Sequence, residues 1–379
     1  MSSRAEKLLQ LGQSVWLDFI RRRDLNDGTF DKLVKESGVV GVTSNPTIFQ
    51  HAFAAADDYD ASIQKLSAQG LTGPALFEAI AIEDIQVACD KLKPAAARTV
   101  GRDGRVSIEV SPHLAHDTTG TIEEGRRLWK SVARENLMVK VPATREGLPA
   151  ITQLTAEGLC INVTLIFSLA RYREVIDAYL KGIEQRVAKG EPVDRIFSVA
   201  SFFVSRVDTK VDKAIEQRLA TLPAGATERA ELEGYRGKVA VANARLAYAE
   251  FQKVFKNSRF APLLEKKANV QRPLWASTGT KNPAYSDVLY VDELVGADTV
   301  NTMPPQTLTA FNDHGALEVR IAHDLDFARR AFERLPQLGV PVNELIDQLE
   351  PEGVTAFEKS YDSLLETLET RRLQMAGGK

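Results

Sequence analysis

The amino-acid sequence predicts an α/β protein of the (β/α)8, TIM-type barrel class, with extra helices and a C-terminal helical tail. Eight short β-favouring runs alternate with helical stretches along the chain. Such alternation is typical of parallel βαβ units, and eight of them over about 250 residues or more indicate a closed barrel. A doubly wound open sheet is the main alternative. Against it, none of the eight runs is followed by a glycine-rich phosphate loop of the dinucleotide or Walker type.

The predicted strands are short runs of β-branched and aromatic residues between helical stretches. They lie within residues 14–20, 39–49, 105–117, 137–143, 160–167, 195–208, 272–280 and 296–304. We expect helices over residues 3–12, 29–37, 57–68, 74–93, 121–134, 146–158, 168–189, 323–335 and 342–373. The charged segment near 210–257 is interpreted as a helical insertion on the surface. Residues 1–379 are expected to form a single domain, with the C-terminal helices at 323–373.

Composition excludes several classes of protein. The 379 residues carry a formal net charge of −3, so the chain lacks the cationic field with which nucleic-acid-binding proteins displace counterions. Cys89 and Cys160 have neither metal-ligand spacing nor a disulfide pattern, which fits a reducing compartment. Residues 1–13 lack the apolar run of a signal peptide, and no stretch approaches ~18 consecutive apolar residues. We expect a cytoplasmic protein that binds neither nucleic acid nor membrane.

The stretch LMVKVPA at residues 137–143 holds a single charge inside an apolar, β-branched run. Strand alternation puts Met138, Lys140 and Pro142 on one face and the two valines on the other. An ammonium group in such a strand loses its hydration, which is unfavourable without compensation. The stem of Lys140 could pack while the amine reaches solvent or a carboxylate. Alternatively, desolvation favours the neutral amine, which forms a Schiff base with a ketone.

Two carboxylates interrupt other predicted strands in the same way. Asp18 lies in SVWLDFI and Glu109 lies in RVSIEVS, each among apolar residues. A buried carboxylate needs a partner or a chemical role. The two acids could neutralise Lys140 as a structural ion pair, or they could transfer protons beside it. Asn45 ends another strand before Pro46, where it is either a cap or turn residue or a polar group at the active-site face.

Two further strands carry polar residues with matching alternation. Asn162 and Thr164 share one face of CINVTLIF. Ser201 and Phe203 share one face of SVASFFVSR, and Arg206 marks the end of that strand. The small polar residues could be plugs inside a barrel, and Arg206 could pair with Asp208 or Asp212 on its own helix. Polar residues at the carboxyl ends of many strands nevertheless fit the usual active-site face of a barrel.

Two longer stretches, VKVPATREGLPAITQLTAEG from Val139 and GVTSNPTIF at residues 41–49, resemble the two signature stretches of the transaldolase family. Further matches extend the resemblance over nearly the whole chain. The resemblance implies a Schiff-base enzyme of the non-oxidative pentose phosphate pathway, with no cofactor and no metal. It would move a dihydroxyacetone unit from sedoheptulose 7-phosphate or fructose 6-phosphate to glyceraldehyde 3-phosphate or erythrose 4-phosphate. The implied partners are phosphorylated sugars, and the chain would be a monomer or a homodimer.

The resemblance also assigns roles to residues. The lysine of KVPATREG, Lys140, would form the imine. The acids of VWLDF and SIEVS, Asp18 and Glu109, would transfer protons, and Thr164 would hold a catalytic water together with Glu109. The residues expected to contact substrate are Asn45, Asn162, Ser201, Phe203, Arg206, Ser277 and Lys281, of which Arg206, Ser277 and Lys281 would bind phosphate.

These residue types suit the cleavage of a ketose. Breaking the bond between carbons 3 and 4 leaves electrons on carbon 3, and a protonated imine at carbon 2 accepts them as an enamine. Lys140 supplies that imine, and Asp18 can take the proton from the hydroxyl on carbon 4. No metal is required, because the lysine replaces the Lewis acid of metal-dependent aldolases. His113 and His116 lack a third ligand nearby in the sequence, which favours a loop or packing role.

The sequence departs from the family pattern at the phosphate. Many members have a second arginine two residues after the serine that corresponds to Ser277, whereas this chain reads STGTKNP and offers Lys281 at a different spacing. The insertion near 218–236 and the long tail resemble the longer bacterial branch, so the oligomeric state does not transfer. A fructose-6-phosphate aldolase is the nearest alternative, but its branch has shorter chains and a tyrosine in place of Phe203. A catalytically idle barrel would have lost the lysine or the acids, and neither is lost.

Overall fold

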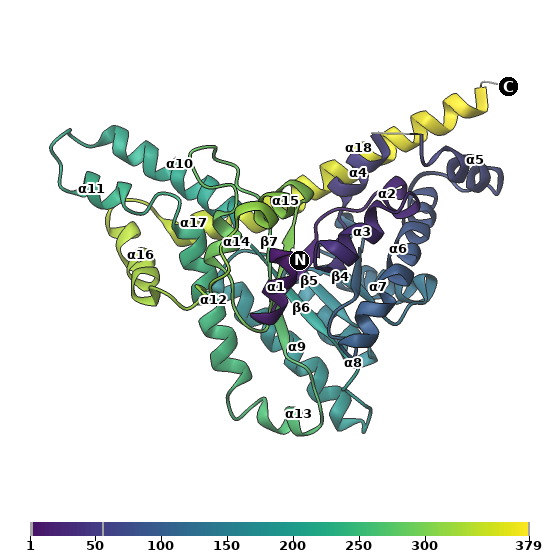
Figure 1. The fold of residues 1–379 in the computed structure, drawn as a ribbon, viewed down its shortest axis with the longest axis horizontal. Coiled ribbons are helices and arrows are strands. Elements are labelled where there is room, and N and C mark those ends of the chain that lie inside the picture. Colours follow the sequence, from purple (N-terminus) through teal and green to yellow (C-terminus); the bar gives the residue numbers. More distant parts are fainter. Residues whose placement is uncertain (1–2, 55–56, 378–379) are drawn as a thin grey trace.

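The computed structural model describes residues 3–54 and 57–377, which fold around a closed barrel (Figure 1). Each strand pairs in parallel with its neighbours in chain order, and β8 closes the ring against β1. The (β/α)8 barrel predicted from the sequence is confirmed. The strands are β1 (Gln13–Leu17), β2 (Val39–Val42), β3 (Arg105–Glu109), β4 (Leu137–Pro142), β5 (Ile161–Ile166), β6 (Ser198–Phe203), β7 (Gln271–Ala276) and β8 (Thr299–Met303).

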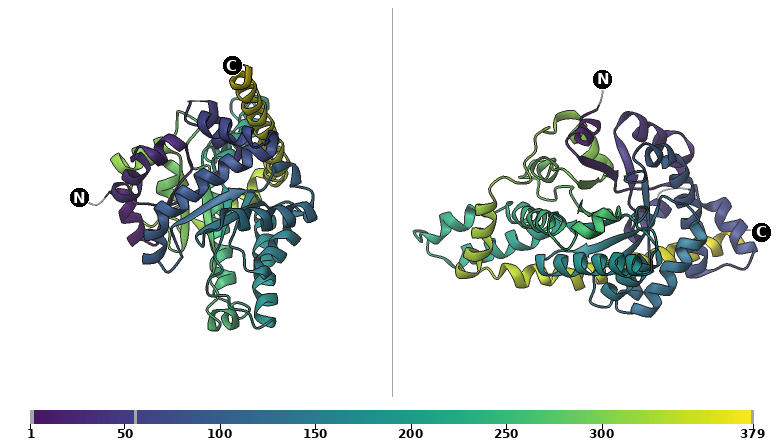
Figure 2. Two further views of the ribbon diagram at one scale, coloured as in Figure 1. Left: turned by 90° about the vertical axis from the view of Figure 1, so that its right-hand side faces the viewer. Right: turned by 90° about the horizontal axis from the view of Figure 1, so that it is seen from below.

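Helices surround the barrel, and the long C-terminal helix runs from the barrel out to one side of the molecule (Figures 1 and 2). In the first half of the chain the helices are α1 (Arg4–Gln10), α2 (Arg22–Asn26), α3 (Thr29–Glu36), α4 (Pro46–Ala54), α5 (Asp60–Ala68), α6 (Gly73–Arg98), the 3-10 helix η1 (Pro112–Leu114), α7 (Thr118–Val132), α8 (Gly147–Glu157) and α9 (Leu169–Ala188). They continue with α10 (Ser205–Thr221), α11 (Glu228–Glu233), α12 (Val239–Phe255), α13 (Ala261–Glu265), α14 (Leu289–Glu293), α15 (Pro305–His314), α16 (Leu325–Gln337), α17 (Val342–Asp347) and α18 (Leu349–Gly377).

Some helix boundaries differ from the sequence expectation. Asp117 accepts a hydrogen bond from the backbone N–H of Gly120 at 3.0 Å, and this N-cap starts α7 three residues earlier than the apolar pattern indicated. The tail expected as one helix over 342–373 is divided into α17 and α18. Among the described residues, no helix combines the length and the apolar character needed to cross a membrane.

The charged segment near 210–257 lies between β6 and β7 and forms most of α10, α11 and α12. In Figure 1 α11 lies at the outer edge of the molecule, whereas α12 runs back toward the barrel. Most of α12 is buried, and Nδ2 of Asn243 donates a hydrogen bond of 2.7 Å to the carbonyl oxygen of Phe167. The connection therefore includes a well-packed helix against the barrel layer. The assignment of residues 1–379 to one domain stays a prediction.

The amino-terminal end of the barrel is closed by a buried charge that is fully paired. Arg272 of β7 donates hydrogen bonds to Oδ1 of Asp103 at 3.0 Å, to the hydroxyl of Ser14 at 2.8 Å and to the carbonyl oxygen of Arg102 at 2.7 Å. A buried guanidinium with several acceptors has its hydrogen-bonding capacity largely satisfied. Arg272 therefore joins neighbouring elements as a structural residue.

Trp16 of β1 fits inside the barrel because the residue that it contacts in β2, Gly41, has no side chain. The indole of Trp16 is fully buried. A Cβ atom added to Gly41 would lie 2.6 Å from three atoms of that indole, so no larger residue fits there without displacing the ring.

We expect Gly41→Ala to destabilise the fold by about 1 to 3 kcal/mol, the usual cost of overpacking a core. Urea unfolding followed by circular dichroism measures this. Gly225→Ala is the matched control, because no atom lies within 4 Å of a Cβ built at Gly225. If both variants unfold at the wild-type urea concentration, the close packing between Gly41 and Trp16 does not constrain the barrel.

Candidate active site

Lys140 and Glu109 form an ion pair at the carboxyl end of the barrel. The strands β3 and β4 are adjacent, and Glu109 lies beside Lys140 in their register. Nζ of Lys140 donates to Oε2 of Glu109 at 3.1 Å and to the carbonyl oxygen of Ser44 at 3.2 Å. Lys140 is 4% exposed, so the amine has lost nearly all of its water. The alternation that put Lys140 on the inward face of its strand is confirmed by this contact.

Asp18 follows β1 and lies near the same amine. Its Oδ1 accepts a hydrogen bond of 2.8 Å from the hydroxyl of Thr43, which lies 2.9 Å from the hydroxyl of Thr302. Burial raises the pKa of Asp18 and of Glu109, and the charge of Lys140 opposes both increases. Each carboxyl therefore holds a proton at a higher pH than an exposed carboxyl does. Groups that exchange protons with a substrate near neutral pH need such a shift.

Polar side chains of β5 and β6 continue this interior layer. Asn162 is the neighbour of Lys140 in the register of β4 and β5. Its Oδ1 accepts a hydrogen bond of 2.7 Å from the hydroxyl of Ser201, and its Nδ2 donates one of 2.9 Å to the hydroxyl of Ser107. These bonds link β3, β5 and β6. Thr164 differs, because its hydroxyl is buried and has no hydrogen-bond partner among the described residues. The protein therefore leaves the hydrogen-bonding capacity of this hydroxyl unused.

Asn45 begins a helix, as the simpler interpretation of the sequence predicted. Its Oδ1 accepts a hydrogen bond of 2.9 Å from the backbone N–H of Ile48, at the start of α4. Pro46 occupies the first helical position, where the missing N–H has no effect on the helix. The side-chain carbonyl of Asn45 is thus used as a cap, which leaves its amide nitrogen for other contacts.

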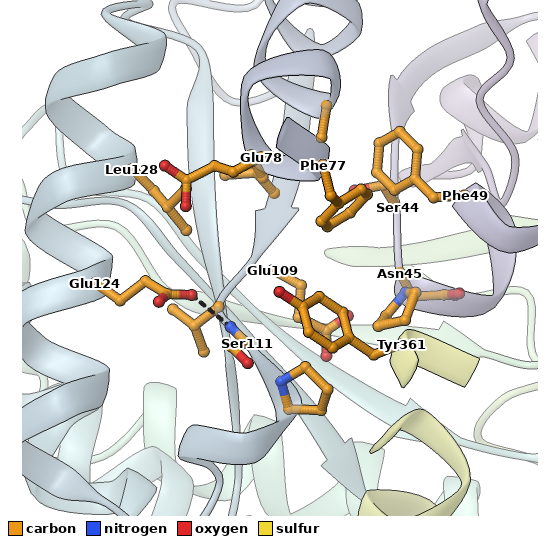
Figure 3. A pocket seen from close by; sticks show the side chains of 15 residues that line it. Ser44, Asn45, Phe49, Phe77, Glu78, Glu109, Ser111, Glu124, Leu128 and Tyr361 are labelled. Atoms are coloured by element: carbon orange, nitrogen blue, oxygen red, sulfur yellow. Dashed lines mark hydrogen bonds between the residues drawn. The ribbon is translucent and has the colours of Figure 1, made fainter. Parts of the chain in front are cut away.

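A small pocket lies to one side of Glu109, where α4, α6, α7 and α18 meet β3 (Figure 3). Figure 3 shows Tyr361 of α18 among the side chains that line it, near Glu109 and Asn45. On the far wall, Glu124 accepts a hydrogen bond of 2.6 Å from the backbone N–H of Ser111. Glu109 therefore borders this pocket and also contacts Lys140 inside the barrel.

Arg206 lies in the first turn of α10, and not at the end of β6 as the sequence indicated. Its Cζ is 5.5 Å from the ring centroid of Phe203 and 6.0 Å from that of Phe357. Burial lowers the pKa of Arg206. Within residues 3–54 and 57–377, Arg206 makes no hydrogen bond or ion pair through its guanidinium. A half-buried arginine in this condition is suited to an anionic ligand.

The acids proposed as partners for Arg206 are engaged elsewhere, so that alternative is wrong. Asp208 accepts a hydrogen bond of 2.9 Å from the hydroxyl of Tyr290, and Asp212 accepts one of 2.7 Å from the hydroxyl of Tyr285. Both tyrosines follow β7 in the chain. These bonds therefore hold the segment after β7 against α10, the helix that carries Arg206.

Ser277 and Lys281 lie in that segment after β7. The backbone of Ser277 is left-handed, with φ of 56°, and its hydroxyl lies 2.9 Å from that of Ser205. Lys281 is exposed, and its charge acts on the carboxyl of Asp18. The structure therefore brings Lys281, Arg206 and Asp18 to the same end of the barrel.

Phe357 is a site residue that sequence reasoning missed. Its ring is 5.8 Å from Nζ of Lys140 and 6.0 Å from Cζ of Arg206, and it is 4% exposed. The residue belongs to α18, whose sequence shows an amphipathic helix but gives no sign of which part of the barrel its apolar face covers. No local signal could have identified it.

The histidine pair does not form a metal site. Among the described residues, no group of three or more histidine, cysteine, aspartate or glutamate side chains could hold a metal ion. His113 lies 2.7 Å from Oδ1 of Asp362, and His116 lies 3.1 Å from Oε2 of Glu146. Both histidines are in surface contacts between elements, as the loop or packing interpretation predicted.

Comparisons with known proteins agree with this arrangement. A family model described as transaldolase/fructose-6-phosphate aldolase matches residues 15–368. The chain belongs to this family. Its relatives include proteins named transaldolase from Saccharopolyspora erythraea, 48% identical over 97% of both chains, and from Mycolicibacterium smegmatis, 49% identical over 94% of both. A transaldolase from Trichodesmium erythraeum is 43% identical over 95% of both chains. The match to the transaldolase family extends from β1 into α18.

The unpaired guanidinium gives a binding prediction. We expect Arg206→Ala to weaken the binding of inorganic phosphate at least about tenfold, because a hydrogen bond to a charged group contributes roughly 1.5 to 3 kcal/mol. Isothermal titration calorimetry measures the dissociation constant. Arg329→Ala removes an exposed arginine of α16 and should leave it unchanged.

The same calorimetric measurement on Lys281→Ala tests whether Lys281 also contacts phosphate. A comparable loss of affinity would assign a phosphate contact to Lys281, and unchanged affinity would make it a surface residue. Equal phosphate binding by the wild type and Arg206→Ala would exclude Arg206 from the anion site.

Proposed function

We infer that this protein is a transaldolase of the non-oxidative pentose phosphate pathway. It transfers a dihydroxyacetone unit from sedoheptulose 7-phosphate or fructose 6-phosphate to glyceraldehyde 3-phosphate or erythrose 4-phosphate. The observation that carries this conclusion is the buried pair of Lys140 and Glu109, 3.1 Å apart, in a chain 48% identical to a named transaldolase over 97% of its length. Phosphorylated sugars are therefore its substrates.

Lys140 is proposed as the residue that forms the covalent intermediate. Its nitrogen attacks carbon 2 of the ketose, the carbonyl oxygen leaves as water, and a protonated imine remains. Glu109 lies in direct contact with the amine and can carry the protons that these steps exchange. The free hydroxyl of Thr164 is assigned to hold the water beside Glu109. The proposal includes no cofactor and no metal, because the imine itself accepts the electrons.

Asp18 is proposed as the base for carbon–carbon cleavage. It takes the proton from the hydroxyl on carbon 4, the bond between carbons 3 and 4 breaks, and its electrons convert the imine into an enamine. An aldose phosphate leaves. The enamine then attacks the aldehyde carbon of the acceptor, Asp18 returns the proton, and hydrolysis of the imine frees the product. The pKa of Asp18, which burial raises, favours this alternation between base and acid.

The remaining site residues are proposed to orient the sugar. Arg206 would bind the terminal phosphate, with Ser277 and Lys281 as further contacts from the segment after β7. The hydroxyl groups of the sugar would meet Asn45, Asn162 and Ser201. Phe203, whose ring lies beside Arg206, presents carbon where the aldolase branch has a tyrosine hydroxyl, which favours transfer over release of the three-carbon unit.

Two further properties complete the proposal. We place the protein in the cytoplasm, where the sugar phosphates of this pathway are found and where its two cysteines, both unpaired and buried, would stay reduced. We propose a monomer or a homodimer, since the site described above is built from one chain.

Trapping of the imine tests the central assignment. Incubation with fructose 6-phosphate and borohydride should leave a reduced three-carbon adduct on Lys140, because borohydride reduces the imine that remains after the aldose phosphate departs. Peptide mass spectrometry locates the adduct. Lys140→Met should give none, whereas Lys281→Ala should still be modified. An adduct on another lysine of the wild type would refute the assignment of Lys140.

Variants that lack one of the two carboxylates should be impaired at different steps of the reaction. Asp18→Ala is expected to form the imine with the intact ketose but to lose cleavage by at least about a hundredfold, the usual contribution of a positioned base. Glu109→Ala is expected to slow imine formation itself. Timed borohydride quenching with mass spectrometry distinguishes a full-length sugar adduct from a three-carbon adduct. Identical adducts at identical rates in both variants would contradict this division of roles.

A further inference from the structure

Helix α18 places one aromatic ring near two cationic groups of the site, Lys140 and Arg206. The ring centroid of Phe357 is 5.8 Å from Nζ of Lys140 and 6.0 Å from Cζ of Arg206. These distances lie at the outer limit of cation–π contact. The ring is almost fully buried.

The location of Phe357 matters because Lys140 and Arg206 mark the two ends of a bound sugar phosphate. Carbon 2 would be attached to Lys140, and the terminal phosphate would lie at Arg206. The intervening carbons must then run past the ring of Phe357. We propose that Phe357 shields the Lys140-bound three-carbon intermediate from water and borders the path of the sugar chain. This inference rests on the transaldolase function proposed above and adds a residue to its site.

The ring is held in place by the packing of α18. A Cβ atom added to Gly353, one turn before Phe357, would lie 3.0 Å from Cδ2 of Leu165 in β5, so the helix approaches the barrel closely at that point. Beyond Phe357, the hydroxyl of Ser360 lies 2.9 Å from that of Thr47 in α4. Contacts on both sides of Phe357 therefore fix it over the barrel mouth, and Figure 2 shows α18 continuing from there toward the C-terminus at one side of the molecule.

Two physical effects follow from a benzyl side chain at this position. The ring has no group that could hydrogen-bond a water molecule and orient it toward the imine carbon. Its negative face also stabilises the positive charge that the protonated imine carries. Both effects lengthen the lifetime of the three-carbon intermediate until an aldose phosphate arrives. Transfer requires this long lifetime, whereas hydrolysis does not.

The test compares the release of dihydroxyacetone from fructose 6-phosphate without acceptor with the rate of transfer when glyceraldehyde 3-phosphate is present. For Phe357→Ala we expect the ratio of release to transfer to rise about tenfold, which corresponds to about 1.4 kcal/mol of lost discrimination. Leu364→Ala is the matched control: it truncates a fully buried residue of the same helix and should keep the wild-type ratio even if it lowers stability.

Phe357→Leu removes less side-chain volume than Phe357→Ala does, and it replaces that variant in the test if Phe357→Ala does not fold. It should raise the ratio by a smaller amount, because it still excludes water but lacks the aromatic face. A wild-type ratio in the folded Phe357 variants, or an equal rise in Leu364→Ala, would overturn the proposal. Failure of the proposed function would be distinct, since the wild type itself would then show neither transfer nor an adduct on Lys140.

Discussion

The ion pair between Lys140 and Glu109 is the interaction on which the organisation of the site depends. An ammonium and a carboxylate so far from water are tolerated only while each has the other, and removing one partner from a buried pair typically costs about 3 to 5 kcal/mol. The closed barrel meets this condition by placing both residues on adjacent parallel strands in register. The same environment makes the two groups chemically useful, because proton transfer between them requires no rearrangement of solvent.

Two buried arginines show how pairing separates structural charge from functional charge. Arg272, at the amino-terminal end of the barrel, has acceptors on a carboxylate, a hydroxyl and a carbonyl group. Arg206, at the carboxyl end, has aromatic rings beside it and no acceptor among the described residues. Both are arginines, of which Arg272 is buried and Arg206 is half-buried. What identifies the binding residue is the hydrogen-bonding capacity that the fold leaves unused.

Much of the fold and of the candidate site could be predicted from the sequence. Alternation in the fourth and fifth strands was enough to place Lys140 and Asn162 inside the barrel, because a side chain in a strand can point only to one of two faces. Phe357 could not be found in this way, since its role depends on where a distant helix docks. The position of Arg206 in α10 was missed because a strand that leads directly into a helix shows no change in composition at the junction.

The position of α18 along the chain affects how the protein matures. All eight strands precede this helix, so during synthesis the barrel and its lysine emerge before the helix that covers them, and chains generally fold from the amino-terminal end as they grow. The contact between Phe357 and Lys140 therefore forms only after every strand of the barrel has been synthesised.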